Sequence, residues 1–217
     1  GTVQISDAIG ATKDLGAVTI QASAATDTGA VTIEEVGSGT TAGATTVTIG
    51  NSTTPNDKIT FTGGVFVTSD DQIFRADAYD MTGTNPTFIA SGKDITFAAS
   101  NGASANGDIV LSDTANLTID TGSGAIGNVS IADTITNVTG SGDDATDVTI
   151  IAGSGNVGIA AVSGDINDLS ITTTGNITLS GDITTAKDTN DTAAGNTAHG
   201  DVTLTGPVLL AADITID

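Results

Sequence analysis

The sequence contains no cysteine and no tryptophan, and only 5 of its 217 residues are basic. Without cysteine the chain can form neither a disulfide framework nor a thiolate metal site, and thiol catalysis is excluded. The 26 acidic residues give a formal charge of −21, and so negative a surface repels nucleic acid and anionic membranes. We therefore expect no nucleic-acid partner, whereas divalent cations and cationic partners remain open.

Long apolar runs are missing as well. No window approaches the roughly 18 consecutive apolar residues that a membrane-spanning helix needs, and no basic leader precedes a hydrophobic run, so we predict no membrane insertion. Hydrophobic residues still make up 38% of the chain, although aromatic residues account for only 3%. The composition thus argues against disorder and predicts a core of small aliphatic side chains.

The sequence does contain a repeated tripeptide, in which Thr or Ser stands between two apolar residues. Twelve copies are centred on Thr19, Thr32, Thr48, Thr60, Thr96, Thr118, Ser130, Thr149, Ser170, Thr178, Thr203 and Thr215. In eight of them the preceding residue is acidic or an amide, namely Asp94, Asn116, Asn128, Asp147, Asp168, Asn176, Asp201 and Asp213. Self-similarity of this kind indicates a repeat architecture. The chain begins and ends inside such copies, so we expect it to be a slice of a longer repetitive protein.

Each copy has the pattern of a short strand with one dry and one wet face. Successive side chains of a strand point to opposite sides, so Ile177 and Leu179 are expected to face the core and Thr178 the solvent. The preceding Gly175-Asn176 is expected to turn the chain, because Gly tolerates positive φ and Asx side chains hydrogen-bond their own backbone. We predict strands and turns throughout, with no helix.

Some copies are spaced 12 residues apart, as at Thr48 and Thr60, others 8 apart, as at Ser170 and Thr178, and the rest are wider. Spacing of this kind fits both a β-solenoid and an antiparallel β-sandwich. Asp-Gly is absent and Asn-Gly is confined to one loop, at Asn101 and Asn106, which disfavours two-residue hairpins. The favoured fold is a single parallel β-helix over residues 1–217, with coils of roughly 20 to 25 residues. On the order of ten coils would make a rod of about 45 to 50 Å. Antiparallel β-sandwich modules are the alternative.

Residues 61–97 depart from the pattern, because they contain all six aromatic residues and the only Arg and Met. One interpretation is an irregular excursion, or a wider coil, whose rings fill a larger core. The other is an interaction patch, since exposed Tyr and Arg are frequent interface anchors. Alternation would place Arg75, Asp77 and Tyr79 outward and Phe74 inward, so Arg75 and Tyr79 are the candidate patch residues.

Candidate chemistry is sparse. The lone His199 has no predictable partner, and five basic residues leave little with which to complete an acid–base site, so we predict no catalytic residue and no enzyme activity. Calcium is the one metal considered, because Asp143, Asp144 and Asp147 offer several hard oxygen ligands in one loop. Neither an EF-hand nor a β-roll nonapeptide is present, and turn chemistry also explains these residues. No cofactor is required.

Copies such as "GNVSIADT", "GDINDLSITTTGNITLSGDITT" and "GDVTLTGPVLLAADITID" resemble the repeat regions of long bacterial surface adhesins of the filamentous haemagglutinin type. The resemblance is clear over 95–217 and looser over 1–60. It implies a right-handed parallel β-helix shaft on a secreted or cell-surface protein. The motifs that mark the secretion domain of such proteins are not found here.

The expected function is that of a non-catalytic structural shaft, extracellular or on the cell surface, in an adhesin, a filament or a biofilm matrix. Its expected partners are further copies joined end to end or additional repeats of the same chain, with surface glycans as another candidate. Two alternatives come from other classes. One is a glycan-binding or glycan-cleaving β-helix domain, and the other is a calcium-dependent β-sandwich adhesin module.

Overall fold

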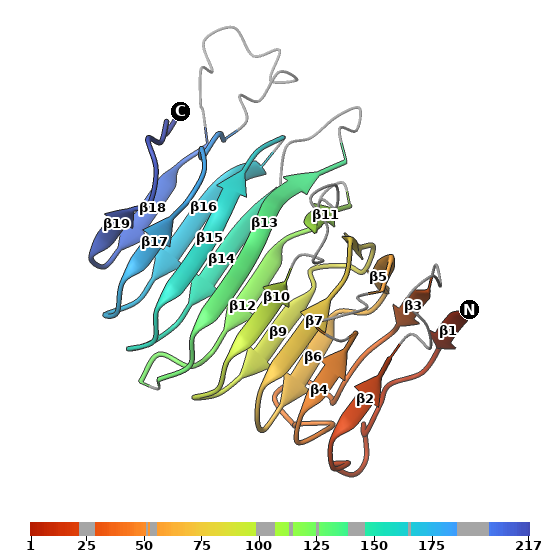
Figure 1. Cartoon of the computed structure of the whole chain (residues 1–217). Coiled ribbons are helices and arrows are strands. Elements are labelled where there is room, and N and C mark those ends of the chain that lie inside the picture. Colours follow the sequence, from red (N-terminus) through yellow and green to blue (C-terminus); the bar gives the residue numbers. More distant parts are fainter. Residues whose placement is uncertain are drawn as a thin grey trace, which may run out of the picture.

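The computed structural model describes residues 1–21, 29–50, 52, 56–98, 107–112, 115–124, 126–138, 146–164, 166–185 and 200–217. All regular structure among these residues is β, and none of it is helical. The described residues accordingly include no helix able to span a membrane. The strands wind into one elongated coil, and the two termini lie toward opposite ends of it (Figure 1).

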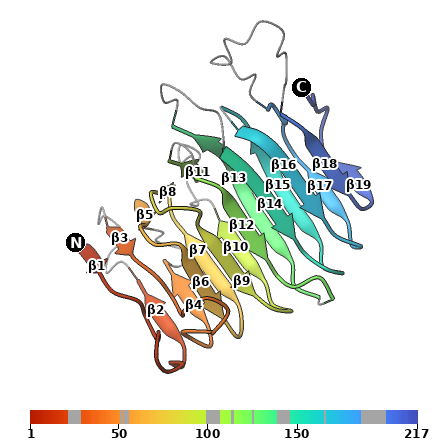
Figure 2. The ribbon, with the colours of Figure 1, turned by 180° about the vertical axis from the view of Figure 1, so that it is seen from behind.

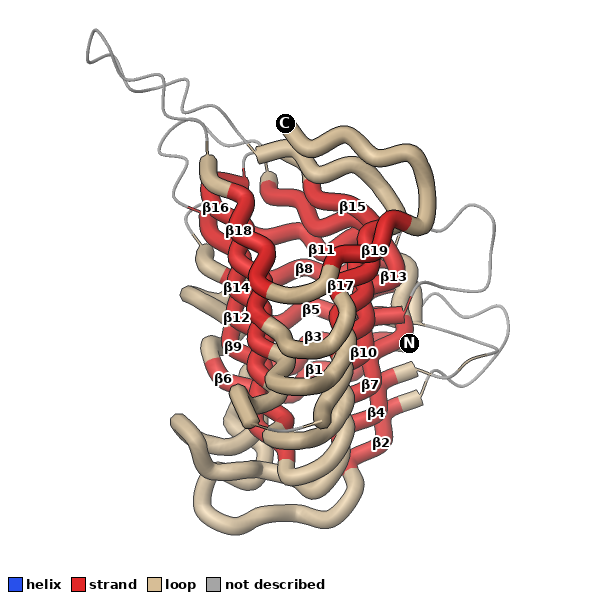
Figure 3. The backbone as a smooth tube through the Cα atoms, turned by 90° about the vertical axis from the view of Figure 1, so that its left-hand side faces the viewer, coloured by secondary structure: helices blue, strands red, loops and turns tan. Residues whose placement is uncertain are grey.

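The strands stack on the equivalent strands of the next turn and form three faces, and the middle turns have a strand on each face (Figure 3). Isolated bridges continue face 3 in the first turns and face 2 in the last turns. Face 1 contains β2 (Val18–Ile20), β4 (Val47–Ile49), β7 (Gln72–Arg75), β10 (Ile95–Ala98), the first parts of β13 (Val129–Asn137) and β15 (Val157–Val162), β17 (Ile177–Leu179) and β19 (Val208–Leu210). Face 2 contains β1 (Thr2–Ile5), β3 (Ala30–Ile33), β5 (Lys58–Phe61), β8 (Ala78–Met81), β11 (Asp108–Leu111) and the second parts of β13 and β15. Face 3 contains β6 (Val65–Thr68), β9 (Thr87–Ala90), β12 (Leu117–Asp120), β14 (Thr146–Ile151), β16 (Ile166–Thr172) and β18 (Val202–Thr205).

Every pairing between these strands is parallel, and repeat copies stack like on like. Thr118 of β12 pairs with Thr149 of β14, which in turn pairs with Ser170 of β16. Within the described part of the chain, the one antiparallel contact is an isolated bridge between Ser38 and Thr41. The predicted parallel β-helix is therefore confirmed, and the β-sandwich alternative is wrong.

The coils are longer, and therefore fewer, than the sequence predicted. One turn takes from 20 residues, between the starts of β15 and β17, to 34 residues, between the starts of β10 and β13. Most of the extra residues lie in the connections at the corners, and the register of the paired strands shifts only within β13–β15 and β14–β16 among the described pairs. The eight strands of face 1 give about 34 Å of stack at a spacing of about 4.8 Å. Figure 2 shows the same stack from behind.

The core fills the slim interior between the three faces. Strand side chains alternate between buried and half-buried in β5, β7, β12 and β14, as a pleated strand with one dry face requires. Ladders of Ile, Val and Leu occupy most of the length. The prediction of an aliphatic core is thus correct for most coils.

The segment 61–97 is not an excursion, because its strands β6 to β10 pair in register with their neighbours. All six aromatic side chains are at most 1% exposed. Phe61 lies at the centre of the cluster, with four phenylalanine ring centroids 4.9 to 6.3 Å away. The interpretation in which the rings fill the core is therefore the correct one.

Candidate functional site

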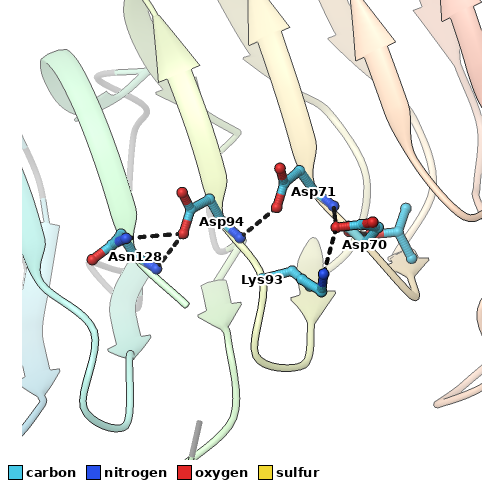
Figure 4. A network of polar contacts seen from close by, with 6 residues as sticks. Asp70, Asp71, Lys93, Asp94 and Asn128 are labelled. Carbon is cyan, nitrogen blue, oxygen red and sulfur yellow. Dashed lines mark hydrogen bonds and ion pairs between the residues drawn. The ribbon is translucent and has the colours of Figure 1, made fainter. Parts of the chain in front are cut away.

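A row of Asx side chains runs along the corner where the chain enters face 1 (Figure 4). In each residue of this row except the last, one side-chain oxygen accepts the backbone N–H of the equivalent residue one coil further on. The row, which we call ladder A, consists of Asp71, Asp94, Asn128, Asn156 and Asn176, with N···O distances of 3.0, 2.7, 2.9 and 3.0 Å. These bonds give the corner N–H groups partners between coils.

Ladder A ends at Asn176 because the next position in the row is a proline. The residue above Asn176 is Pro207, whose carbonyl accepts the N–H of Ile177 at 2.8 Å. Proline has no N–H to donate, so Asn176 cannot extend the row. Its side chain is exposed, in contrast to the half-buried Asn128, which also donates its Nδ2 to Asp94 at 3.0 Å.

One ion pair flanks the start of ladder A. The ammonium of Lys93 lies 3.0 Å from an oxygen of Asp70, and the same carboxylate accepts the N–H of Asp71 at 3.1 Å. Lys93 lowers the pKa of Asp70, and Asp70 raises the pKa of Lys93. Both groups are solvent-exposed, so the pair adds little to the stability of the fold.

A second row, ladder B, follows the corner where the chain enters face 3. Here too, in each residue except the last, one side-chain oxygen accepts the backbone N–H of the next residue in the row. Its members are Asn85, Asn116, Asp147, Asp168 and Asp201, with distances of 3.0, 2.8, 3.3 and 2.8 Å. Asp147 and Asp168 thus each use a carboxylate oxygen to bind the N–H of the next coil, and Asp201 takes part through its own N–H.

The ladders correct the expected role of the Asx residues. Turn chemistry predicted bonds from each side chain to its own backbone, but the bonds join neighbouring coils instead. Seven of the eight positions identified in the repeat belong to the two ladders, and Asp213 is the exception. Asn156 precedes Val157-Gly158-Ile159, in which Gly replaces the central Thr or Ser of the repeat, so the tripeptide as defined did not include it.

The glycines beside ladder A also have a different role from the expected one. Gly127, Gly155 and Gly175 precede ladder residues, and none of them has positive φ. A Cβ on Gly155 would overlap the carbonyl oxygen of Gly127, and a Cβ on Gly175 would overlap that of Gly155. The repeated Gly-Asn pair thus allows the coils to approach closely at this corner.

Two buried threonines form hydrogen bonds on the inner side of the same corner. Thr121 donates its hydroxyl to the carbonyl of Gly127 at 2.8 Å, and Thr173 donates to that of Gly155 at 2.5 Å. Both side chains are at most 3% exposed. A buried hydroxyl needs such a partner, so the corner is hydrogen-bonded on its inner and outer sides.

The candidate patch of Arg75 and Tyr79 does not exist. Arg75 is half-buried on the outer side of β7, as predicted, but Tyr79 is 0% exposed. Alternation does not continue across the corner between β7 and β8: Ala76 is buried and the next buried residue is Tyr79, three positions on. The corner therefore reverses the phase of β8, which a single alternating pattern could not predict.

Tyr79 instead forms hydrogen bonds with the backbone at this corner. Its phenol oxygen accepts the N–H of Ala76 at 3.0 Å and lies 2.9 and 2.6 Å from the carbonyl oxygens of Phe74 and Ala98. Burial raises the pKa of the phenol, so Tyr79 stays neutral. With all the aromatic rings buried, the described residues offer no aromatic platform for a sugar near 61–97.

The calcium candidates separate into two groups. Asp143 and Asp144 lie outside the described residues, whereas Asp147 belongs to ladder B, where it accepts the N–H of Asp168 at 3.3 Å and the Nδ2 of Asn167 at 3.0 Å. The described part of the chain contains no group of three or more acidic or His side chains placed to hold a metal ion. His199 also lies outside that part.

A hollow of about 100 Å³ opens beside face 3, at the corner that leads to face 1. Its lining consists of hydroxyl-bearing residues, one Gly and one Ile: Ser123, Ile151, Gly153, Thr172, Thr173, Thr174 and Thr205. No titratable side chain lines it, so it presents no acid, base or charged nucleophile.

Comparison with known proteins adds no identification: no family profile, no curated protein and no solved structure matches the chain. The fold class, a β-solenoid with two Asx ladders, is therefore the level of identity that the chain itself supports.

Proposed function

We propose that this chain is a rigid, non-catalytic shaft segment of an extracellular or cell-surface protein, an adhesin of the filamentous haemagglutinin type or a filament or biofilm matrix component. The observation that carries the proposal is the continuous parallel pairing of strands from β1 to β19. A continuous solenoid of this kind holds whatever it carries at a fixed distance.

The ladders support a mechanical role. Bending or shearing the stack would break bonds between coils, and ladders A and B add side-chain bonds to the backbone pairing at two corners. The outer residues of the strands are largely Thr, Ser and Asp, which keeps the surface hydrated. Together these features suit a shaft better than a binding module.

End-to-end continuation is part of the proposal. Inward-facing aliphatic side chains are 40 to 60% exposed at Val208, Leu210 and Ile216, and 41 to 47% exposed at Val3 and Leu15. A further coil, supplied by the same polypeptide or by a second copy, would cover them and pair the open strand edges.

Two experiments test the function. Antibodies raised against this chain should label intact producing cells or their matrix, without permeabilisation. Deleting the segment in frame should shorten the surface structure seen by electron microscopy, by about 38 Å for eight coils at about 4.8 Å each, and should leave its chemistry unchanged. Labelling only after permeabilisation would overturn the proposed location. Loss of a measurable hydrolytic activity in the deletion would overturn the non-catalytic role.

A further inference from the structure

Two aspartates meet where face 1 turns into face 2. Asp108 begins β11, and Asp133 lies at the bend inside β13, on the next coil. The register Ile109 to Ile135 places Asp108 opposite Thr134, next to Asp133. Both carboxyls are half-buried.

Asp133 already uses both of its oxygens. Oδ1 accepts the N–H of Thr134 at 2.9 Å, and Oδ2 accepts the N–H of Gly107 from the coil below at 2.8 Å. Two N–H donors stabilise a negative charge on this side chain. The Asp133 carboxylate therefore joins β11 to β13 in the same way as the ladder residues join their coils.

Asp108 is in a different situation. Burial, and then the charge of the adjacent Asp133 and a hydrogen bond with it, raise the pKa of Asp108, whereas hydrogen bonds with Thr134 lower it. Two carboxylates cannot hydrogen-bond each other without a proton between them.

Among the described residues, β8, β11 and β13 supply no cation to relieve the pair. On the β8 side, Asp108 lies opposite the uncharged Ala78. Of the other charged groups there, Asp77 precedes β8, and Asp80 forms an ion pair with Lys58 of β5. Asp133 is the only ionisable residue of β13, and β11 has none besides Asp108. Ionisation of Asp108 thus places a second negative charge beside Asp133.

We propose that Asp108 and Asp133 share one proton and form a pH-sensitive joint between β11 and β13, which is closed when Asp108 is protonated and weakened by charge repulsion when both groups are ionised. The proposal is independent of the shaft function. Acidification should strengthen this corner of the solenoid, whereas it weakens a typical salt-bridged carboxylate.

The direction of the effect follows from linkage. A carboxyl whose folded pKa lies above its unfolded value, about 3.9 for Asp, binds its proton more tightly in the folded state. Its contribution to stability is complete below the unfolded value and is lost as pH rises through the folded value. The joint should therefore be strongest in mild acid.

A carboxyl-carbon NMR titration of the full chain tests the shared proton directly. We expect Asp108 to titrate above about 3.9. In Asp133→Asn, Asp108 should move back toward the ordinary value. An Asp108 that titrates as an ordinary aspartate in the unsubstituted chain would overturn the proposal.

Thermal unfolding of Asp108→Asn gives a second test. The amide keeps a donor toward Asp133 at every pH, so the variant should match the parent chain near pH 3.5 and unfold at a higher temperature near pH 7, about three units above the ordinary value. The control is Asp120→Asn, another half-buried strand residue, which accepts the N–H of Gly122. An equal offset between Asp108→Asn and the parent chain at both pH values would overturn the proposal. If Asp108→Asn fails to fold, the NMR titration of the parent chain decides.

Discussion

The coils from β5 to β10 and the coils from β13 to β17 follow the same three-sided path with different interiors. The first group encloses five phenylalanines and Tyr79, and the second encloses Val, Ile and Leu ladders with Ala at the corners. Ring centroids in the first group lie 4.7 to 6.3 Å apart, as expected for packed aromatic pairs.

The corners differ in the same way. Where the aromatic coils enter face 1, ladder A begins with Asp71 and continues through Lys93-Asp94, with the Lys93 ion pair outside. The aliphatic coils have Gly-Asn at the equivalent place, and their backbones approach so closely that no Cβ would fit. The comparison teaches that a coil forms when apolar side chains point inward and the corner hydrogen bonds are kept. Whether those side chains are aromatic or aliphatic does not change the path of the chain.

Truncation of the central ring should have the largest effect. Phe61→Ala removes the side chain that touches four other rings, and we expect a loss of about 4 kcal/mol in the free energy of unfolding. Ile159→Ala, in the aliphatic coils, should cost about 3 kcal/mol. Urea unfolding followed by circular dichroism measures both. A smaller loss for Phe61→Ala than for Ile159→Ala would contradict the central place of the aromatic cluster.

Substitution of a corner glycine tests the close approach in the aliphatic coils. Gly155→Ala would force a Cβ into the backbone of Gly127, and we expect a loss of about 3 kcal/mol. The matched control is Gly158→Ala on the outer side of β15, where a Cβ meets nothing within 4 Å and the effect should lie within about 0.5 kcal/mol. Equal stabilities for the two variants would show that the corner adjusts freely.

Removal of the phenol group tests the corner specific to the aromatic coils. Tyr79→Phe leaves the buried N–H of Ala76 without its acceptor, and we expect a loss of about 2 kcal/mol. Amide hydrogen exchange should increase at Ala76, and exchange at Val157 in the aliphatic coils should stay unchanged. Unchanged protection of Ala76 would mean that the phenol does not fasten this corner.

The ladder bonds should have the smallest effect of the four. Asn128→Ala removes the acceptor of the Asn156 N–H and the donor to Asp94, and we expect a loss of about 1 kcal/mol. Asn176→Ala should change stability by less than about 0.5 kcal/mol, because Pro207 offers no N–H to accept. Of these two residues, Asn128 alone accepts an N–H from a further coil. A loss of stability in Asn176→Ala as large as in Asn128→Ala would therefore contradict the ladder.

Most of the fold could be predicted from the repeat. The tripeptide around Thr118, Thr149 and Ser170 identified strands that the structure stacks in register, because a period of two determines which side chains are buried. The number of coils was overestimated, because the lengths of corner connections are not written in the strand pattern. The orientation of Tyr79 was mispredicted for a related reason: a corner can add one residue and reverse the phase of the next strand.

The sequence by itself determined the kind of coil. Short strands with aliphatic side chains on one side and Thr on the other can bury their dry face only by stacking on similar strands. Only the tertiary structure decided what the Asx residues bond to, and it alone brought Asp108 beside Asp133. These partners lie 20 to 34 residues apart along the chain, and the length of each corner connection decides which residues face each other.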